Sequence, residues 1–230
     1  AWIYPDVDDA GQTIFAAGNS GATHTYLILS ILSNGKLIVH QRENDTTDQF
    51  YGNETISAAT WQSVALVSSG TAWSLYLDGT AQSLTVDGSG SNAGEWFSDT
   101  ASLSNIAIGA QIKSNVTDEF NGKIMQVAYW GGSSGTTGVL DADAIAALHA
   151  AGKGYDIKGS GNTGNYDSWA DDLKGYWRMG NHYLDSAGNI TIHDASGYGH
   201  DMHGVSNPLA KTWTTGTTFL EGWQDRGYFT

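Results

Sequence analysis

Apolar and polar residues alternate in short stretches along the first part of the chain. Successive side chains of a strand point to opposite faces of its sheet, so alternation with a period of two is typical of strands that bury one face. In residues 73–77, for example, Trp73, Leu75 and Leu77 share one face, which we predict to be the core face. The pattern predicts strands over residues 13–17, 25–32, 36–41, 62–68, 72–77 and 82–86.

Two short segments between these strands predict tight turns. Asn34-Gly35 separates residues 25–32 from residues 36–41, and Asp78-Gly79 follows residues 72–77. Such pairs accept the positive φ angles that two-residue hairpin turns require. We therefore predict a β-hairpin at each position.

The second half of the chain carries further strand patterns and one clear helix pattern. Asp141 is a good N-cap, alanines follow it, and Gly152 ends the pattern, so we predict a helix over residues 141–152. Ile145 and Leu148 should face the sandwich. The other predicted elements are a loop at 87–94, strands at 105–109, 122–130 and 175–179, a helical turn at 167–173 and a loop-rich C-terminal tail.

The composition favours an all-β fold. The 230 residues include 30 Gly and only 2 Pro, which is typical of frequent tight turns. With 9 Trp, 11 Tyr and 6 Phe, the chain has enough large side chains to fill the space between two sheets. We expect an antiparallel two-sheet sandwich over residues 1–180, with residues 174–180 as the candidate final strand, and a loop-rich, interface-forming extension over residues 181–230.

Charge and cysteine content exclude several classes of function. Asp and Glu number 24 against 10 Lys and Arg, and the resulting net charge of −14 disfavours nucleic acid and anionic lipid as partners. No apolar run approaches the roughly 18 residues that span a membrane. The absence of cysteine excludes disulfides, thiolate metal sites and a Cys nucleophile. We expect partners among neutral glycans, cations and other proteins.

Several short motifs follow one another across residues 1–152. In order, they are Trp2-Ile3-Tyr4-Pro5, Gln12-Thr13-Ile14-Phe15, Asn34-Gly35-Lys36-Leu37, Trp61-Gln62-Ser63-Val64-Ala65, Leu75-Tyr76-Leu77-Asp78-Gly79 and Phe120-Asn121-Gly122-Lys123-Ile124. In this order the motifs resemble those of the laminin-G-like, concanavalin A-type domain. The resemblance implies a jelly-roll sandwich.

One block that resembles the opening of such a domain comes last in this chain. It comprises residues 173–180 (Leu-Lys-Gly-Tyr-Trp-Arg-Met-Gly) and residues 194–201. The first and last strands of a jelly roll can be neighbours, so we expect the block to complete the sheet in permuted fashion. The alternative is that the chain runs from one unit into a remnant of another. A laminin-G-like unit followed by this block is similar to structural proteins of marine bacteriophages, which implies a virion setting.

The resemblance also raises the question of catalysis. The best-known enzymes of this fold are retaining β-glucanases, whose Glu-x-Asp-x-x-Glu strand holds two carboxylates about 5 Å apart. The nearest string here contains Glu43, Asp45 and Asp48; it places Asp where the acid/base Glu is expected and lacks the apolar flanks of a strand. We interpret residues 43–48 as a solvated loop and expect no enzyme. A divergent glycoside hydrolase is the remaining alternative.

Calcium is the candidate cofactor, because the resemblance implies a hard cation at the sheet rim in many members of the family. The candidate oxygen ligands are Asp6, Asp8, Asp78 and Asp118, although none forms a diagnostic spacing. His193, His200 and His203 invite comparison with a zinc site. Glycines around them argue against the helix that would align them, so we interpret them as surface or inter-subunit histidines.

Aromatic residues outside the strand patterns are candidates for stacking on sugar rings or for anchoring a protein interface. We expect the Trp96-Phe97 pair to project outward from its loop, and we expect Trp61, Trp73, Trp130 and Trp177 in the core. The candidate contact residues are Tyr51, Trp96, Phe97, Tyr198, Trp213 and Trp223.

Together these features predict a non-catalytic structural or adhesion protein on an extracellular particle. The leading interpretation is a phage virion surface component, either a capsid decoration or a tail-associated protein, whose partners are other virion proteins or further copies of itself in a homo-oligomer. The alternative is a carbohydrate-binding module of a secreted or cell-surface protein, for which a host-surface glycan is the expected ligand.

Overall fold

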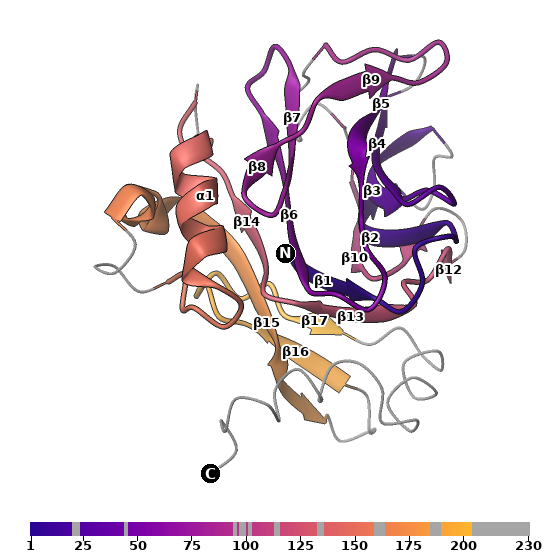
Figure 1. Ribbon diagram of the computed structural model, residues 1–230. Coiled ribbons are helices and arrows are strands. Elements are labelled where there is room, and N and C mark those ends of the chain that lie inside the picture. Colours follow the sequence, from indigo (N-terminus) through magenta and orange to yellow (C-terminus); the bar gives the residue numbers. More distant parts are fainter. Residues whose placement is uncertain are drawn as a thin grey trace. The chain divides into compact units, whose positions relative to one another are not determined.

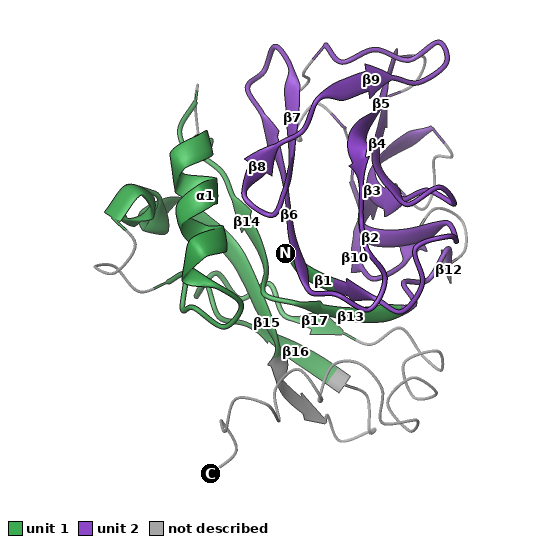
Figure 2. Ribbon diagram, in the orientation of Figure 1, with its two compact units in different colours: residues 1–3, 122–230 green, residues 4–121 purple. Residues whose placement is uncertain are grey.

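The computed structural model describes residues 1–19, 24–43, 46–93, 96, 100, 103–112, 116–132, 136–158, 164–184 and 190–203 (Figure 1). The chain forms two compact units. Unit 1 contains residues 1–3 and 122–230, and unit 2 contains residues 4–121 (Figure 2).

Unit 2 is built from strands. They are the second half of β1 (Trp2–Pro5), β2 (Gln12–Gly18), β3 (Thr25–Ile31), β4 (Lys36–Glu43), β5 (Thr46–Thr55), β6 (Gln62–Ser68), β7 (Trp73–Leu77), β8 (Thr80–Ala81), β9 (Leu84–Val86), β10 (Asn105–Ile108), β11 (Gln111–Ile112) and β12 (Val116–Thr117). Six of them form one antiparallel sheet in the order β10-β2-β3-β4-β5-β9. Strands β6, β7 and β8 pair antiparallel in a second sheet.

The two sheets of unit 2 face each other and enclose its core (Figure 1). A Cβ atom placed on Gly52 of β5 would lie 3.1 Å from a methyl carbon of Leu75 on β7, so the two strands approach closely there. Glycine provides the space for this contact. The buried side chains between the sheets include Ile31, Leu37, Val39, Phe50, Val64, Trp73 and Leu75.

Both predicted hairpins are present. The turn before β4 contains Gly35 at a φ of 77°, and the β7–β8 turn places Asp78 and Gly79 at φ angles of 49° and 75°. Trp73, Leu75 and Leu77 are buried as predicted, and Tyr76 between them is buried too. The β7–β8 turn thus has the positive φ at both residues that a two-residue turn requires, whereas in the β3–β4 turn only Gly35 of the pair has a positive φ.

The prediction of a solvated loop over residues 43–48 is wrong where the structure describes this segment. Glu43 ends β4 and pairs with Thr46, and Thr46–Thr55 forms the longest strand of unit 2. The inner positions of this strand are Asp48, Phe50 and Gly52, of which only Phe50 is a large apolar residue. Asp and Gly are not apolar residues, so the alternation of buried and exposed positions in β5 is not visible as an apolar pattern in the sequence.

Unit 1 contains a second β-region and both helices. Its elements are β13 (Gly122–Met125), β14 (Val127–Trp130), α1 (Ala142–Ala151), the 3₁₀ helix η2 (Gly164–Asp172), β15 (Leu173–Leu184), β16 (Ile190–Asp194) and β17 (Met202–His203). Four strands pair antiparallel in the order β14-β15-β16-β17. The block predicted to supply the final strand is thus the second strand of this sheet, and two strands follow it within the predicted tail.

The single strand predicted over residues 122–130 is wrong, because the structure has two strands there. Gln126 between them has a φ of 51°, which interrupts the extended backbone. Its side chain anchors the segment that follows α1: Nε2 donates to the Tyr155 carbonyl oxygen over 2.8 Å, and Oε1 accepts from the Gly154 N–H over 2.6 Å.

The predicted helix is confirmed as α1. The Asp141 carboxylate accepts a hydrogen bond from the Ala144 N–H over 2.8 Å, and Gly152 caps the other end at a φ of 80°. Ile145 is buried, as predicted, whereas Leu148 is half-buried. The described residues are mostly strand with two short helices, which confirms the all-β prediction. None of the helices in these ranges has the length and apolar character to cross a membrane.

Candidate functional site

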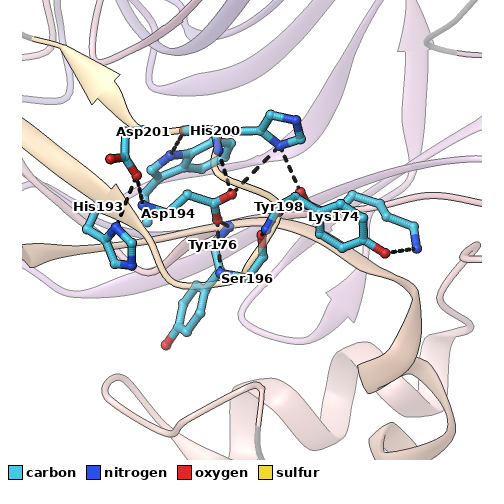
Figure 3. A network of polar contacts seen from close by, with 9 residues as sticks. Lys174, Tyr176, His193, Asp194, Ser196, Tyr198, His200 and Asp201 are labelled. Carbon is cyan, nitrogen blue, oxygen red and sulfur yellow. Dashed lines mark hydrogen bonds and ion pairs between the residues drawn. The ribbon is translucent and has the colours of Figure 1, made fainter.

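A buried carboxylate organises the loop between β16 and β17. Asp194 is fully buried, and its Oδ1 accepts hydrogen bonds from the backbone N–H groups of Tyr176 and Ser196, each over 2.9 Å. Its Oδ2 accepts from the His200 N–H, also over 2.9 Å. The loop of residues 195–200 therefore closes around a single side chain, as Figure 3 shows.

Hydrogen bonds determine the charge state of this carboxylate. Burial by itself raises the pKa of Asp194, but hydrogen bonds from the Ser196 side chain and from backbone N–H groups outweigh burial, and the pKa lies below its ordinary value. Asp194 is therefore ionised at neutral pH. Asp201 extends the network by accepting from the Asp194 N–H over 2.8 Å and from Nδ1 of His193 over 3.1 Å.

Three side chains lie side by side on this scaffold, the half-buried Lys174 and the exposed Tyr198 and His200 (Figure 3), and we call them the Tyr198 surface. The Tyr198 ring is 54% exposed, and the His200 side chain is 60% exposed. Their ring planes differ by only 9°, with centroids 6.2 Å apart, so they present parallel faces. Lys174 Nζ donates to the Tyr198 hydroxyl over 2.9 Å.

The position of the ammonium group leaves the Tyr198 ring available for stacking. Nζ of Lys174 lies 2.9 Å from the hydroxyl oxygen but 4.9 Å from the ring centroid, so it sits at the hydroxyl edge of the ring. The hydrogen bond to Tyr198 raises the pKa of Lys174, which remains an ammonium at neutral pH. An ammonium has three N–H donors, and Tyr198 uses one of them.

His200 adds a hydrogen-bond acceptor beside the ring. Its Nδ1 lies 3.1 Å from the Lys174 carbonyl oxygen. A carbonyl oxygen can only accept, so Nδ1 carries a proton in this contact, and in the tautomer with that one ring proton Nε2 is an acceptor. The Tyr198 surface thus combines an aromatic face with charged and neutral hydrogen-bonding groups, the combination that binds an amphipathic ring such as a sugar.

Sequence comparison with known families identifies the superfamily. A family model described as the Concanavalin A-like lectin/glucanases superfamily matches residues 1–136, more than half of the chain. The chain belongs to this superfamily. Membership confirms the predicted jelly-roll sandwich and the resemblance on which it was based. The comparison with curated proteins found no match.

Solved structures share the superfamily fold. The chain is similar to a Bacteroides ovatus protein described as a "putative carbohydrate binding protein", with a TM-score of 0.54 and 18% identity over 89% of this chain and 50% of that one. It is also similar to the CBM40 of a Ruminococcus gnavus IT-sialidase bound to alpha2,3 sialyllactose, with a TM-score of 0.45 and 18% identity over 53% and 67% of the two chains. The chain spans half the length of the Bacteroides ovatus protein.

The predicted contact aromatics differ in their surroundings. Tyr198 is exposed, whereas Tyr51 and Trp96 are half-buried. A Cβ atom placed on Gly70 would lie 2.5 Å from the Trp96 indole, so Trp96 packs over Gly70 rather than projecting freely. Phe97, Trp213 and Trp223 lie outside the described residues. Of the tryptophans predicted in the core, Trp73 and Trp177 are buried and Trp61 and Trp130 are half-buried.

The aspartates predicted as calcium ligands serve turns and loops. Asp78 accepts hydrogen bonds from the Ser63 N–H over 2.8 Å and from Gln62 Nε2 over 3.2 Å. Asp8 accepts from the Ala58 N–H, Asp118 accepts from the Thr117 hydroxyl, and Asp6 donates its backbone N–H to the Asn121 carbonyl oxygen. No three acidic or histidine side chains form a metal-binding group in the part of the chain that the structure describes. Calcium binding stays a prediction.

The other candidates for chemistry are engaged in separate contacts. Asp48 is buried and accepts hydrogen bonds from the Ala93 N–H over 3.0 Å and from the Ser91 hydroxyl, so its carboxylate is part of the packed interior. Asp45 lies outside the described residues. The three histidines bond to different groups: His193 to Asp201, His200 to the Lys174 carbonyl, and His203 to the Thr191 hydroxyl.

Sequence reasoning found Tyr198 but missed Lys174 and the role of Asp194. Lys174 precedes Tyr198 by 24 residues and reaches it only because Ala195 pairs through its N–H with the Tyr176 carbonyl oxygen. No local pattern carries that information. The run Asp194-Ala-Ser196-Gly-Tyr198-Gly-His200-Asp201 does carry a signal, since Asp and Ser among glycines are typical of side chains that bond nearby backbone N–H groups.

Proposed function

We propose that this chain is a non-catalytic carbohydrate-binding domain of a secreted or cell-surface protein, and that the Tyr198 surface contacts the sugar. The observation that carries the proposal is the exposed Tyr198 ring, flanked by Lys174 and His200 and fixed on the Asp194 scaffold. The apolar face of a pyranose would stack on Tyr198. The Lys174 ammonium would donate to a sugar oxygen, and Nε2 of His200 would accept from a hydroxyl.

The superfamily supports this proposal because its description names lectins and glucanases. The fold likeness to a Bacteroides ovatus protein described as carbohydrate binding is consistent with it. The carboxylates near the surface argue for binding rather than hydrolysis: Asp194 is buried under backbone N–H groups, and Asp201 is bonded to the Asp194 N–H and to His193. A glycosidase needs a carboxyl pair free to exchange protons with substrate.

A virion-surface role, the leading interpretation of the sequence, has less support than the carbohydrate-binding alternative. Neither of the two structures described above is a virion protein. The Tyr198 surface also fits a glycan ligand without reference to any particle.

The proposal is tested with the full chain on an array of glycans, followed by calorimetric titration of the strongest ligand. We expect Tyr198→Ala to weaken binding about tenfold, because loss of an aromatic stacking contact worth about 1.5 kcal/mol corresponds to roughly that factor in Kd. Tyr198→Phe keeps the ring and removes the hydroxyl bonded to Lys174, so it should weaken binding by less than about threefold.

Ile106→Ala is the matched control, because Ile106 is 44% exposed and lies on β10 in unit 2. It removes a comparable exposed apolar group and should leave binding unchanged. A wild-type chain that binds no glycan, or a Tyr198→Ala variant that binds as well as wild type, would overturn the proposal.

A further inference from the structure

Strand β4 presents a row of basic and polar side chains on the outer side of the six-stranded sheet. Its burial alternates, with Leu37, Val39 and Gln41 buried and the residues between them half-buried. Two of the half-buried residues are Lys36 and Arg42. We call the face that carries them the β4 outer face; the residues on it from β4 are Lys36, Ile38, His40 and Arg42.

At one end of this face a hydrogen-bonded cluster holds Arg42. Arg42 lies opposite Tyr26 on β3, and although burial raises the pKa of the Tyr26 hydroxyl, the nearby Arg42 guanidinium acts in the opposite direction. The Tyr26 hydroxyl also lies 3.3 Å from His40 Nε2, and the two rings meet edge to face with centroids 5.0 Å apart. Tyr26 is buried, so it forms the base of the cluster from which His40 and Arg42 extend.

At the other end an ammonium group lies over an aromatic ring. Lys36 Nζ is 4.8 Å from the centroid of Tyr51, a half-buried residue of β5 that lies opposite Ile38. Alternate residues of a strand are about 6.6 Å apart, so Lys36 and Arg42 are separated by about 20 Å along β4. Two fixed cations at this spacing match an extended polymer better than a small anion.

The charge of this face differs from that of the chain as a whole. The positions that share it on the neighbouring strands are Tyr26, Ile28 and Ser30 on β3 and Thr47, Gln49 and Tyr51 on β5. None of these described positions is Asp or Glu. Asp87 is at the rim, where its Oδ2 accepts from Gln49 Nε2 over 2.6 Å. Glu43 follows Arg42 at the end of β4, on the opposite side of the strand. Charges beyond about 8 Å are largely screened at physiological ionic strength, so most of the net charge of −14 acts only weakly on the two cations.

We propose that the β4 outer face is a second binding surface, and that its ligand is an acidic polysaccharide. Arg42 and Lys36 pair with carboxylate or sulfate groups several sugars apart along the polymer, and the Tyr51 ring and Ile38 contact the sugar rings between them. The proposed ligand differs from the neutral glycans that are expected from the net charge alone. All residues of this surface belong to unit 2, whereas the Tyr198 surface belongs to unit 1. A test of binding at one surface therefore does not depend on binding at the other.

The test measures binding of the full chain to polygalacturonate, which carries carboxylates, to dextran sulfate, and to uncharged dextran. We expect binding to at least one acidic polymer, weakening as salt is added, and no binding to dextran. Thr47→Glu introduces a carboxylate opposite Arg42 without removing a cation, and it should weaken binding at least tenfold. Binding to only one acidic polymer would identify carboxylate or sulfate as the recognised group.

Two controls separate this surface from the overall charge. Thr80→Glu makes the same charge change at an exposed position of β8 and should leave binding unchanged. Lys36→Gln should weaken binding severalfold, whereas Lys153→Gln, which removes a half-buried cation from unit 1, should not. The proposal fails if neither acidic polymer binds at low salt, if uncharged dextran binds equally well, or if both Glu variants lose binding to the same extent.

Discussion

Asp194 illustrates how one side chain can fix an exposed loop. Its carboxylate accepts from the N–H groups of Tyr176, Ser196 and His200, which belong to β15 and to both ends of the loop. Each oxygen of a carboxylate accepts, whereas the nitrogen of an amide only donates. A change from Asp to Asn therefore replaces one accepting oxygen by an NH2 donor, which then faces a backbone N–H that has lost its acceptor.

We expect Asp194→Asn to lower the free energy of unfolding by about 1–3 kcal/mol, the usual cost of leaving a buried donor unpaired. Urea denaturation at pH 7 measures the difference. Because the folded-state pKa of Asp194 is lowered, its contribution is complete above the unfolded-state pKa of about 4 and is lost as pH falls through the folded-state value. The difference between variant and wild type should therefore shrink below about pH 4.

Asp156→Asn provides the comparison for this measurement. Asp156 is exposed and faces Arg178 across 3.8 Å, a surface ion pair worth about 1 kcal/mol at most. It should change the stability far less than Asp194→Asn at pH 7. Equal effects of the two substitutions would show that Asp194 does not organise the loop.

The strands and helix show where local patterns suffice and where they fail. Asn34-Gly35, Asp78-Gly79 and Asp141 carry their conformations in their own chemistry, so both hairpins and α1 were predictable. Strand β5 was missed because its inner positions depend on other strands: Gly52 makes room for Leu75, and Asp48 is paired by Ser91 and Ala93. The residue type at such positions is determined by contacts with residues that are distant in the sequence, so a local pattern does not reveal it.

Gln126 separates β13 from β14 through its backbone and its side chain together. We expect Gln126→Ala to be less stable than Gln126→Gly by about 1 kcal/mol, since both lose the bonds to Gly154 and Tyr155 but only glycine adopts a φ of 51° without strain. Thermal or urea unfolding of the two variants measures this. The opposite ranking, which holds at ordinary strand positions, would rule out a left-handed residue here.

At the level of the whole chain, the fold was predictable and the candidate site only in part. Ordered motifs over residues 1–152 identified the superfamily, and Tyr51 and Tyr198 were among the predicted contact residues, a role that stays a prediction. Lys174, His40 and Arg42 were not, because their roles depend on cross-strand neighbours. For β4 a signal was present: Lys36, His40 and Arg42 all have even numbers on an alternating strand.

Self-association through the C-terminal extension stays a prediction, and the structure improves its test. A truncation at Asn181 would cut β15 and remove β16 and β17, so the chain should instead end at His203. Light scattering should then show an oligomer for the full chain and a monomer for the shortened one, because Trp213 and Trp223 are removed. The same number of subunits in both forms would contradict assembly through this segment.

The alternation of β4 has a consequence for how such a domain diversifies during evolution. Leu37 and Val39 face the core and tolerate little change, while Lys36, Ile38, His40 and Arg42 face outward on the same strand. Substitutions at the half-buried outward positions alter charge and shape and disturb the packing less than substitutions of Leu37 or Val39. Lineages can therefore acquire new ligand preferences on an unchanged scaffold, and sequence divergence among relatives should concentrate at the even-numbered positions of this strand.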